Sequence, residues 1–124
     1  MKIAVSSTGP ELTHAVEPRF GRTPYLIIRD TTTGETEVVS NSTNAASAQG
    51  AGIRTAELVV RHGAEIVVSG NIGPKAFAAL EQAGVLAMIC AHGTVEEAIE
   101  LACNDQLVVR SQADVPGHAG KPGR

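Results

Sequence analysis

The stretch EIVVSGNIGPKAFAALEQAGVLAMIC, residues 65–90, decides the fold of this chain. Residues 65–69 form a continuous apolar run, and a glycine-rich segment leads from it into a helical pattern that ends at Gly84. Pro74 suits the first position of this helix, where its missing N–H costs nothing. Residues 86–90 are a second apolar run. Strands that alternate with helices in this way predict a parallel sheet with right-handed crossovers.

The same theme repeats toward the C-terminus. Thr94 and Glu97 match a capping box, so a further helix is expected to begin there. Residues 107–110 predict a short extended piece. Beyond them, residues 111–124 are polar and interrupted by Pro and Gly, which is typical of a flexible tail. We therefore expect one domain over residues 1–110 and a tail over residues 111–124.

The N-terminal half is expected to complete the sheet. Strands are indicated at residues 2–6, 25–30 and 35–40. The last two flank a turn-like TTTG segment and predict a β-hairpin. Apolar residues from 53 to 60 fall at helical spacing and stop at His62-Gly63. The expected fold class is α/β, with a five-stranded mixed sheet and helices on its faces.

The composition fits a single core in a reducing compartment. The 124 residues are 43% hydrophobic, with no Trp, one Tyr and two Phe, so small branched side chains must fill the core. Two cysteines are too few for a disulfide framework. The net charge of −3 gives no basic field for nucleic acid, and no stretch resembles a signal peptide or a bilayer span. A cytoplasmic location is expected, with no nucleic-acid and no membrane partner.

Ligands of such sheets bind beyond the carboxyl ends of the parallel strands. Three loops are expected at that edge, at residues 6–9, 69–75 and 90–94. Two longer segments, 8–23 and 41–50, lack periodicity, and ordered loops of that length are usually functional. This edge of the sheet is therefore the candidate binding site.

The segment PRFGR, residues 18–22, places two guanidinium groups beside an apolar ring and a flexible backbone. That combination suits a large, soft anion. Alternatively, Phe20 is a core side chain and Arg19 and Arg22 form surface ion pairs with residues such as Glu17 or Asp30.

Two glycine-rich segments each lead into a helix, GNIGPK at 70–75 and QGAGI at 49–53. Free N–H groups and the positive end of the helix dipole favour anions at such positions, and Lys75 adds a full charge. Neither segment has the spacing of a P-loop or of a dinucleotide-binding motif. The alternative is that these glycines only turn a strand or a loop into a helix.

Cys90 and His92 are two residues apart at a strand end and are the candidate metal ligands. The alternative is a buried cysteine beside an ordinary loop histidine. No pair of carboxylates is placed by its spacing at the loop edge, and no nucleophile motif is present. The sequence therefore predicts a binding protein and not an enzyme.

PRFGR at 18–22, QGAGI at 49–53 and GNIGPKAF at 70–77 resemble, in order and spacing, segments of the dinitrogenase iron-molybdenum cofactor biosynthesis family. The resemblance covers roughly residues 2–109. It implies a ribonuclease H-like fold that binds a preformed metal-sulfur cluster. Within the family it is greatest to a branch from sulfate-reducing anaerobes, for which it implies a molybdenum-copper sulfide cluster held without covalent bonds. Other members carry the iron-molybdenum cofactor or its precursors toward nitrogenase.

A cluster of this kind is a soft trianion with a sulfide surface, so cations, backbone N–H groups and apolar contacts would suit it. The residues expected to contact it are Arg19, Phe20, Gly21, Arg22, Gly50, Gly52, Asn71, Ile72, Lys75 and Gly93. The alternatives are a carrier of iron-molybdenum cofactor and a regulatory module that uses the same loops to bind a protein. In the carrier roles, a partner protein would receive the cluster.

Overall fold

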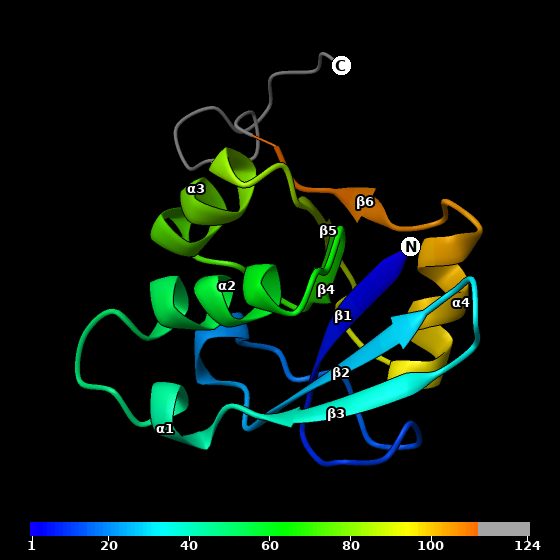
Figure 1. The fold of residues 1–124 in the computed structure, drawn as a ribbon, viewed down its shortest axis with the longest axis horizontal. Helices are drawn as coiled ribbons and strands as arrows, with labels where there is room; N and C mark the ends of the chain where they lie inside the picture. Colours follow the sequence, from blue (N-terminus) through cyan, green and yellow to red (C-terminus); the bar gives the residue numbers. More distant parts are fainter. Residues whose placement is uncertain (112–124) are drawn as a thin grey trace.

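A six-stranded mixed sheet organises residues 1–111, the part of the chain that the computed structural model describes (Figure 1). The strand order is β3-β2-β1-β4-β5-β6. The strands are β1 (Lys2–Ser7), β2 (Tyr25–Asp30), β3 (Thr36–Ser40), β4 (Ile66–Ser69), β5 (Leu86–Ile89) and β6 (Val108–Val109). β1, β4 and β5 are parallel, whereas β2, β3 and β6 are antiparallel to their neighbours. The predicted parallel core and the predicted hairpin are both confirmed.

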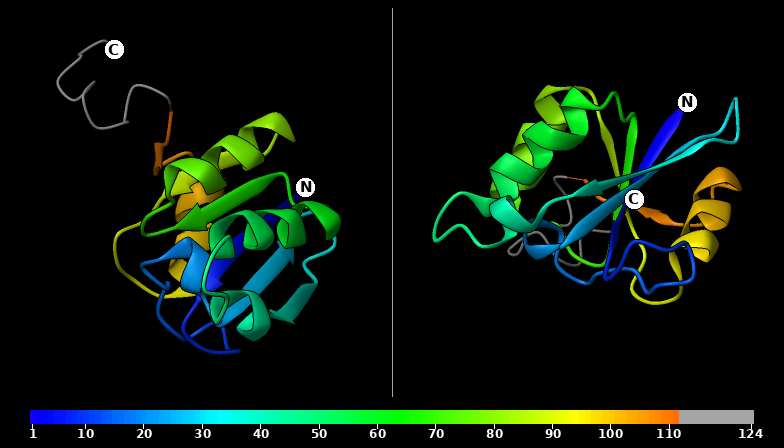
Figure 2. Two further views of the ribbon diagram at one scale, coloured as in Figure 1. Left: turned by 90° about the vertical axis from the view of Figure 1, so that its left-hand side faces the viewer. Right: turned by 60° about the horizontal axis from the view of Figure 1, so that its bottom comes forward.

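Helices cover both faces of this sheet (Figure 2). They are α1 (Ser42–Ala45), α2 (Ala51–Arg61), α3 (Pro74–Gln82) and α4 (Val95–Cys103), with a 3-10 turn, η1, at Phe20–Arg22. α2 and α3 pack on one face through a cluster that includes Val59, Phe77 and Leu80, and α4 packs on the other. Because successive strand residues alternate in direction, Ala4 belongs to the first cluster and Ile3 and Val5 to the second.

The predicted number of strands is wrong by one. Val108 and Val109 pair with Ile89 and Met88, and the Arg110 N–H donates to the Ala87 carbonyl at 2.8 Å. A two-residue strand has no alternation that a sequence pattern can reveal, and it forms because β5 offers unpaired backbone groups along its outer edge. The ribonuclease H-like assignment, which came from the family resemblance, stays a prediction.

Two further features bear on the predicted organisation. Residues 112–124, nearly all of the predicted tail, lie outside the described residues. Within residues 1–111, no helix combines the length and the apolar character needed to cross a membrane.

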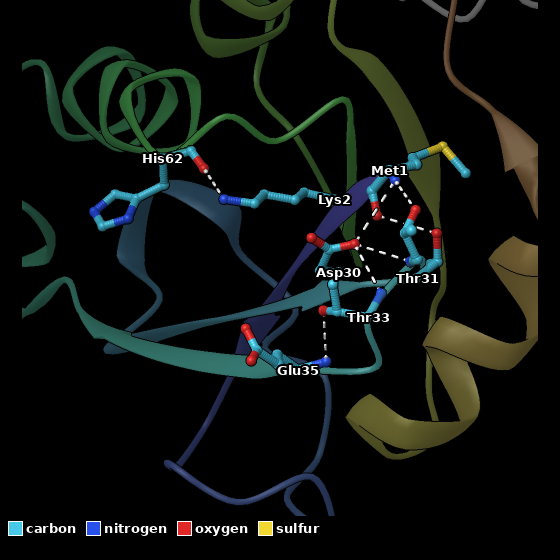
Figure 3. Close-up of polar contacts among 8 residues, drawn as sticks. Met1, Lys2, Asp30, Thr31, Thr33, Glu35 and His62 are labelled. Atoms are coloured by element: carbon cyan, nitrogen blue, oxygen red, sulfur yellow. Dashed lines mark hydrogen bonds and ion pairs between the residues drawn. The ribbon is translucent and has the colours of Figure 1, made fainter.

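At the end of the sheet where β1 begins, local contacts satisfy the polar groups (Figure 3). The Asp30 carboxylate accepts from the Thr32 N–H at 2.8 Å and lies 3.9 Å from the N-terminal amine of Met1. The hydrogen bond from the Thr32 N–H is the main reason why the pKa of Asp30 is lowered. Lys2 reaches the His62 carbonyl at 3.5 Å. Contacts within the chain therefore hold this end of the sheet together.

Candidate functional site

The long loop before β2 crosses the carboxyl ends of the parallel strands. Isolated bridges join Ser7 to Val16 and Arg19 to Asn71, and the Phe20 N–H donates to the Asn71 carbonyl at 3.0 Å. The PRFGR segment and the loop after β4 therefore lie side by side, although about fifty residues separate them in the sequence.

A buried network of hydroxyl groups holds these loops in place. The Ser6 hydroxyl lies 2.8 Å from the Ser69 hydroxyl and donates to the Glu17 carbonyl at 2.8 Å. The Thr23 hydroxyl accepts from the Ser7 N–H at 2.9 Å, and the Asn41 side-chain amide donates to the Thr23 carbonyl at 2.9 Å. Because buried polar groups are costly when unpaired, this network restricts where the loops can sit.

Glycines allow the loops to pass close to their neighbours. A Cβ on Gly70 would lie 2.7 Å from the Pro18 Cα, and a Cβ on Gly21 would lie 3.0 Å from the backbone of Gly52. A Cβ on Gly52 would in turn approach the Ala76 Cβ at 3.1 Å. The glycines therefore bring η1 and the starts of α2 and α3 into direct contact.

One cavity, of about 680 Å³, opens where these three elements meet. Its lining residues are Gly21, Gln49, Gly50, Gly52, Ile53, Arg54, Gly73, Pro74, Lys75 and Ala76. Its volume lies within the range of about 300–1,000 Å³ that is typical of small-molecule sites. The structure therefore brings predicted residues from PRFGR, QGAGI and GNIGPK to one site, called the helix-start cavity below.

The two helices that begin at this cavity have no side-chain cap. Gly50 and Gly73 are their N-cap residues, neither makes a side-chain capping bond, and neither first turn contains an acidic residue. α4 differs, because Thr94 and Glu97 form the predicted capping box, with bonds of 3.1 and 2.9 Å. The first N–H groups of α2 and α3 have no acceptor within their helices and so are available to an external one.

Cations lie where a helix dipole disfavours them. Lys75 is in the first turn of α3, and Arg54 is the fourth residue of α2; both side chains are exposed and line the cavity. Positive charge at a helix N-terminus is unfavourable unless an anion is bound there. The arrangement would therefore be stabilised by an anion bound in the cavity.

Arg54 is not among the site residues that the sequence predicts. The sequence contained a feature that could have identified Arg54 as a site residue. It lies four residues after Gly50, and helical side chains point back toward the N-terminus of their helix. An arginine at that position reaches the same end of the helix as the glycine.

The structure separates the roles of the two arginines of PRFGR. Arg22 Nη1 donates to the carbonyls of Ala45 and Ser47 at 2.7 and 2.8 Å, so it positions the loop that leads to α2. The Arg19 side chain is exposed and, within residues 1–111, makes no hydrogen bond or ion pair. The alternative of ion pairs from these arginines to Glu17 or Asp30 is therefore not what the structure shows.

The prediction that Phe20 and Ile72 cover the ligand does not agree with their burial. Each side chain is 1% exposed and belongs to the core cluster between the sheet and helices α2 and α3. Large apolar side chains gain more free energy from burial in this core than from exposure in a loop. The alternative, Phe20 as a core side chain, is correct.

Cys90, His92 and Gly93 line a different cavity, next to α4, which also contains Glu97 and Glu100. The Cys90 thiol is buried and donates to the His92 carbonyl at 3.2 Å, and burial raises its pKa. A metal ligand must be a thiolate, which this surrounding disfavours. Within residues 1–111, no group of three or more His, Cys, Asp or Glu side chains could hold a metal ion. The structure therefore does not support direct ligation by Cys90 and His92, and Gly93 lies apart from the helix-start cavity.

The two cysteines are expected to react very differently with iodoacetamide at neutral pH. Cys103 is exposed and should be alkylated more than about tenfold faster than Cys90, whose thiol is buried and has a raised pKa. Peptide mass spectrometry after timed quenching measures both rates, and the denatured chain, in which both thiols react, is the control. Equal rates in the folded protein would contradict this assignment.

Comparison with known proteins identifies relatives along most of the chain. The family model for the dinitrogenase iron-molybdenum cofactor matches residues 1–105. The apo orange protein from Desulfovibrio gigas superposes with a TM-score of 0.85 at 34% identity, covering 89% of this chain and 92% of that one. A NifB-like protein from Thermotoga gives 0.78 at 37% identity, covering 87% and 91%. An uncharacterized protein of Methanocaldococcus jannaschii is 29% identical over 110 residues, covering 86% of this chain and 89% of its own length.

Proposed function

The chain belongs to the dinitrogenase iron-molybdenum cofactor family, and from this membership we propose that it binds and carries an anionic metal-sulfur cluster without covalent bonds. We further propose that the cluster is a molybdenum-copper sulfide and that the protein is a carrier and not an enzyme. A recipient protein would take the cluster from it.

The observation that carries the proposal is the pair of uncapped helix starts that open on one cavity. α2 and α3 each present unpaired first-turn N–H groups there, and each has a cation within its first four residues. N–H groups and positive charges together favour an anion, and the CH groups of Ile53 and Ala76 in the same wall favour a polarisable surface. A sulfide-covered trianion meets both conditions.

The similarity to the orange protein favours the molybdenum-copper cluster. It extends over most of both chains, and the motifs of the binding edge resemble the branch for which such a cluster is expected. The family description favours a second candidate, in which the cargo is the iron-molybdenum cofactor or a precursor for nitrogenase. Metal analysis of protein isolated from its native host separates the two candidates, because only the first contains copper.

Anaerobic reconstitution with tetrathiomolybdate and copper tests the proposal. The full chain is expected to retain a coloured species through desalting, at about one cluster per chain, since one helix-start cavity is present in the described chain. The same reagents without protein serve as the control. Complete loss of colour on desalting would exclude tight binding of this cluster.

A further inference from the structure

β6 is one of the two outer strands of the sheet (Figure 1). It pairs with β5 along one side, where the Arg110 N–H donates to the Ala87 carbonyl. Hydrogen-bonded and non-hydrogen-bonded residues alternate along an antiparallel strand, so the N–H and C=O of Val109 point away from β5. Within residues 1–111, no strand pairs with β6 on that side. The Val109 backbone is therefore available to an added strand.

The two outer strands, β6 and β3, differ in their side chains. Val108 is 68% exposed, Val109 is 42% exposed, and Leu86 on the neighbouring strand is 41% exposed. β3 instead carries Glu37, whose carboxylate lies 3.2 Å from the imidazole of His62. A charged side chain discourages the addition of a strand to an edge, whereas exposed apolar residues allow it. β6 is therefore the outer strand better suited to pair with another segment.

Two cavities of about 560 Å³ flank β6, and Ile89 and Val108 line both. The first, called the α4 cavity below, is lined by residues of α4, and the second by the start of α3. α3 and α4 cover opposite faces of the sheet. A strand added to β6 would direct alternate side chains to these two faces. Because β6 has only two residues, the cavities must supply much of the affinity and the specificity.

The lining of the α4 cavity is negatively charged. It includes Glu97 and Glu100, and among the described residues no lysine or arginine lines it. Glu97 accepts the Thr94 N–H at 2.9 Å, whereas Glu100 is exposed and forms no ion pair within residues 1–111. Leu101 and Leu107 lie in the same wall and suit the methylene stem of a long side chain. The cavity therefore fits a lysine or an arginine.

A second copy of this chain fits the edge less well. If two β6 strands paired in antiparallel fashion about Val109, the added strand would direct Leu107, Val109 and Ser111 toward the α4 face. None of these side chains is a cation, so Glu100 would gain no counter-charge. Charge complementarity therefore favours a different protein as the occupant.

We propose that the outer edge of β6 binds an extended segment of a partner protein by strand addition. A lysine or arginine of that segment enters the α4 cavity, and the apolar residues on either side of it face the α3 cavity. The inference goes beyond the proposed function and does not rest on it, because the surface needs no bound cluster. Every test below uses the apo protein.

The probe is the N-acetylated, C-amidated peptide Thr-Val-Lys-Val-Thr, titrated into the ¹⁵N-labelled full chain. Saturable shifts are expected for the amides of residues 107–110 and 97–104. The matched peptide with glutamate in place of lysine is expected to bind about tenfold more weakly, because it places like charges together. A peptide methylated at the backbone nitrogen of its lysine should also lose binding, since that nitrogen can no longer donate to the Val109 carbonyl. Absence of saturable shifts, or equal binding of the lysine and glutamate peptides, would overturn the proposal.

Val109→Pro tests the edge itself. It removes an N–H that points away from β5, and proline is tolerated on an outer strand at such a position. Peptide binding is expected to fall more than about tenfold, whereas Val109→Ala, which keeps the N–H, should lose about threefold, the size of one cross-strand contact. Wild-type affinity in Val109→Pro would overturn the proposal. If circular dichroism shows that Val109→Pro is unfolded, the N-methylated peptide decides.

Glu100→Gln tests the charge of the α4 cavity. It is expected to weaken binding of the lysine peptide about threefold, as for one exposed ion pair, and to leave the glutamate peptide no weaker. Glu57→Gln is the charge-matched control, because Glu57 is exposed on α2 and does not line this cavity. Equal effects of the two variants would mean that overall charge, and not the α4 cavity, selects the peptide, which would overturn the proposal.

Hydrogen exchange and light scattering on the apo full chain test the other possible occupants of the edge. Fast exchange of the Val109 N–H in a monomer is expected. Slow exchange in a monomer would mean that another segment of the chain already covers the edge. A dimer that forms with rising concentration and slows this exchange would assign the edge to a second copy. Either result would overturn the proposal of a different partner.

Discussion

Replacing Arg54 and Lys75 together with glutamine is expected to weaken binding of the reconstituted cluster by about 100-fold. A hydrogen bond to a charged group contributes about 1.5–3 kcal/mol, and each 1.4 kcal/mol is a factor of ten in affinity. Both side chains are exposed at the helix-start cavity, so their loss removes charge without disturbing the core. Equilibrium titration followed by cluster absorbance, with retention after desalting, measures the effect.

The control for this variant removes two charges from the opposite end of the molecule. Lys2→Gln with Arg61→Gln changes the net charge by the same amount, yet these residues lie at the start of β1 and the end of α2. Its affinity is expected to remain within about twofold of wild type, because charges beyond the Debye length of about 8 Å are screened at physiological salt. Equal losses in the two double variants would mean that overall charge, and not this cavity, binds the cluster.

Phe20→Ala is expected to lower the free energy of unfolding by about 3–5 kcal/mol, the usual cost of emptying a buried aromatic site. Phe20 is 1% exposed and packs in the cluster between the sheet, α2 and α3. Chemical denaturation of the apo protein measures the change. A ligand-covering role would predict the opposite pattern, with a nearly unchanged apo protein and a weakened complex.

Phe20→Leu separates these two roles more cleanly. It keeps most of the apolar volume and removes the ring, so the apo protein should lose far less stability than with alanine. Because the ring does not reach the helix-start cavity surface, cluster affinity is expected to remain within about twofold of wild type. A shifted cluster absorbance or a tenfold loss of affinity in Phe20→Leu would restore Phe20 as a ligand contact.

Sequence patterns predicted those helices and strands that are specified by a few adjacent residues. The run at 65–69, Pro74 and the Thr94–Glu97 capping box each predicted a feature that the structure has, because strand burial, helix starts and caps depend on a few adjacent residues. The short helix α1 was beyond such patterns, and so was the pairing of β6 with the sheet, although residues 107–110 predicted an extended piece. Each contains at most four residues, and each depends on partners elsewhere in the chain, such as Met88 for Val109.

Some features of the candidate site could likewise be predicted from the sequence, and others could not. Its glycine-rich helix starts and Lys75 could be identified from sequence because a helix N-terminus has a compositional signature. The burial of Phe20, the use of Arg22 to hold backbone carbonyls and the position of Arg110 above Phe77 could not. Whether an arginine faces a ligand, a carbonyl or a ring depends on distant segments that lie beside it.

The sequence by itself indicated an α/β protein that resembles the iron-molybdenum cofactor family and has glycine-rich helix starts, because periodicity, caps and motifs can be recognised in the chain without its tertiary contacts. Only the tertiary structure decided which cations share a cavity. It joined Arg54 to Lys75 through the Gly21, Gly52 and Ala76 contacts. It placed Phe20 and Ile72 in the core, and Cys90 and His92 at a separate cavity beside α4. The physical reason is that burial and close approach depend on contacts between segments far apart in the chain, and a sequence pattern reports only neighbours.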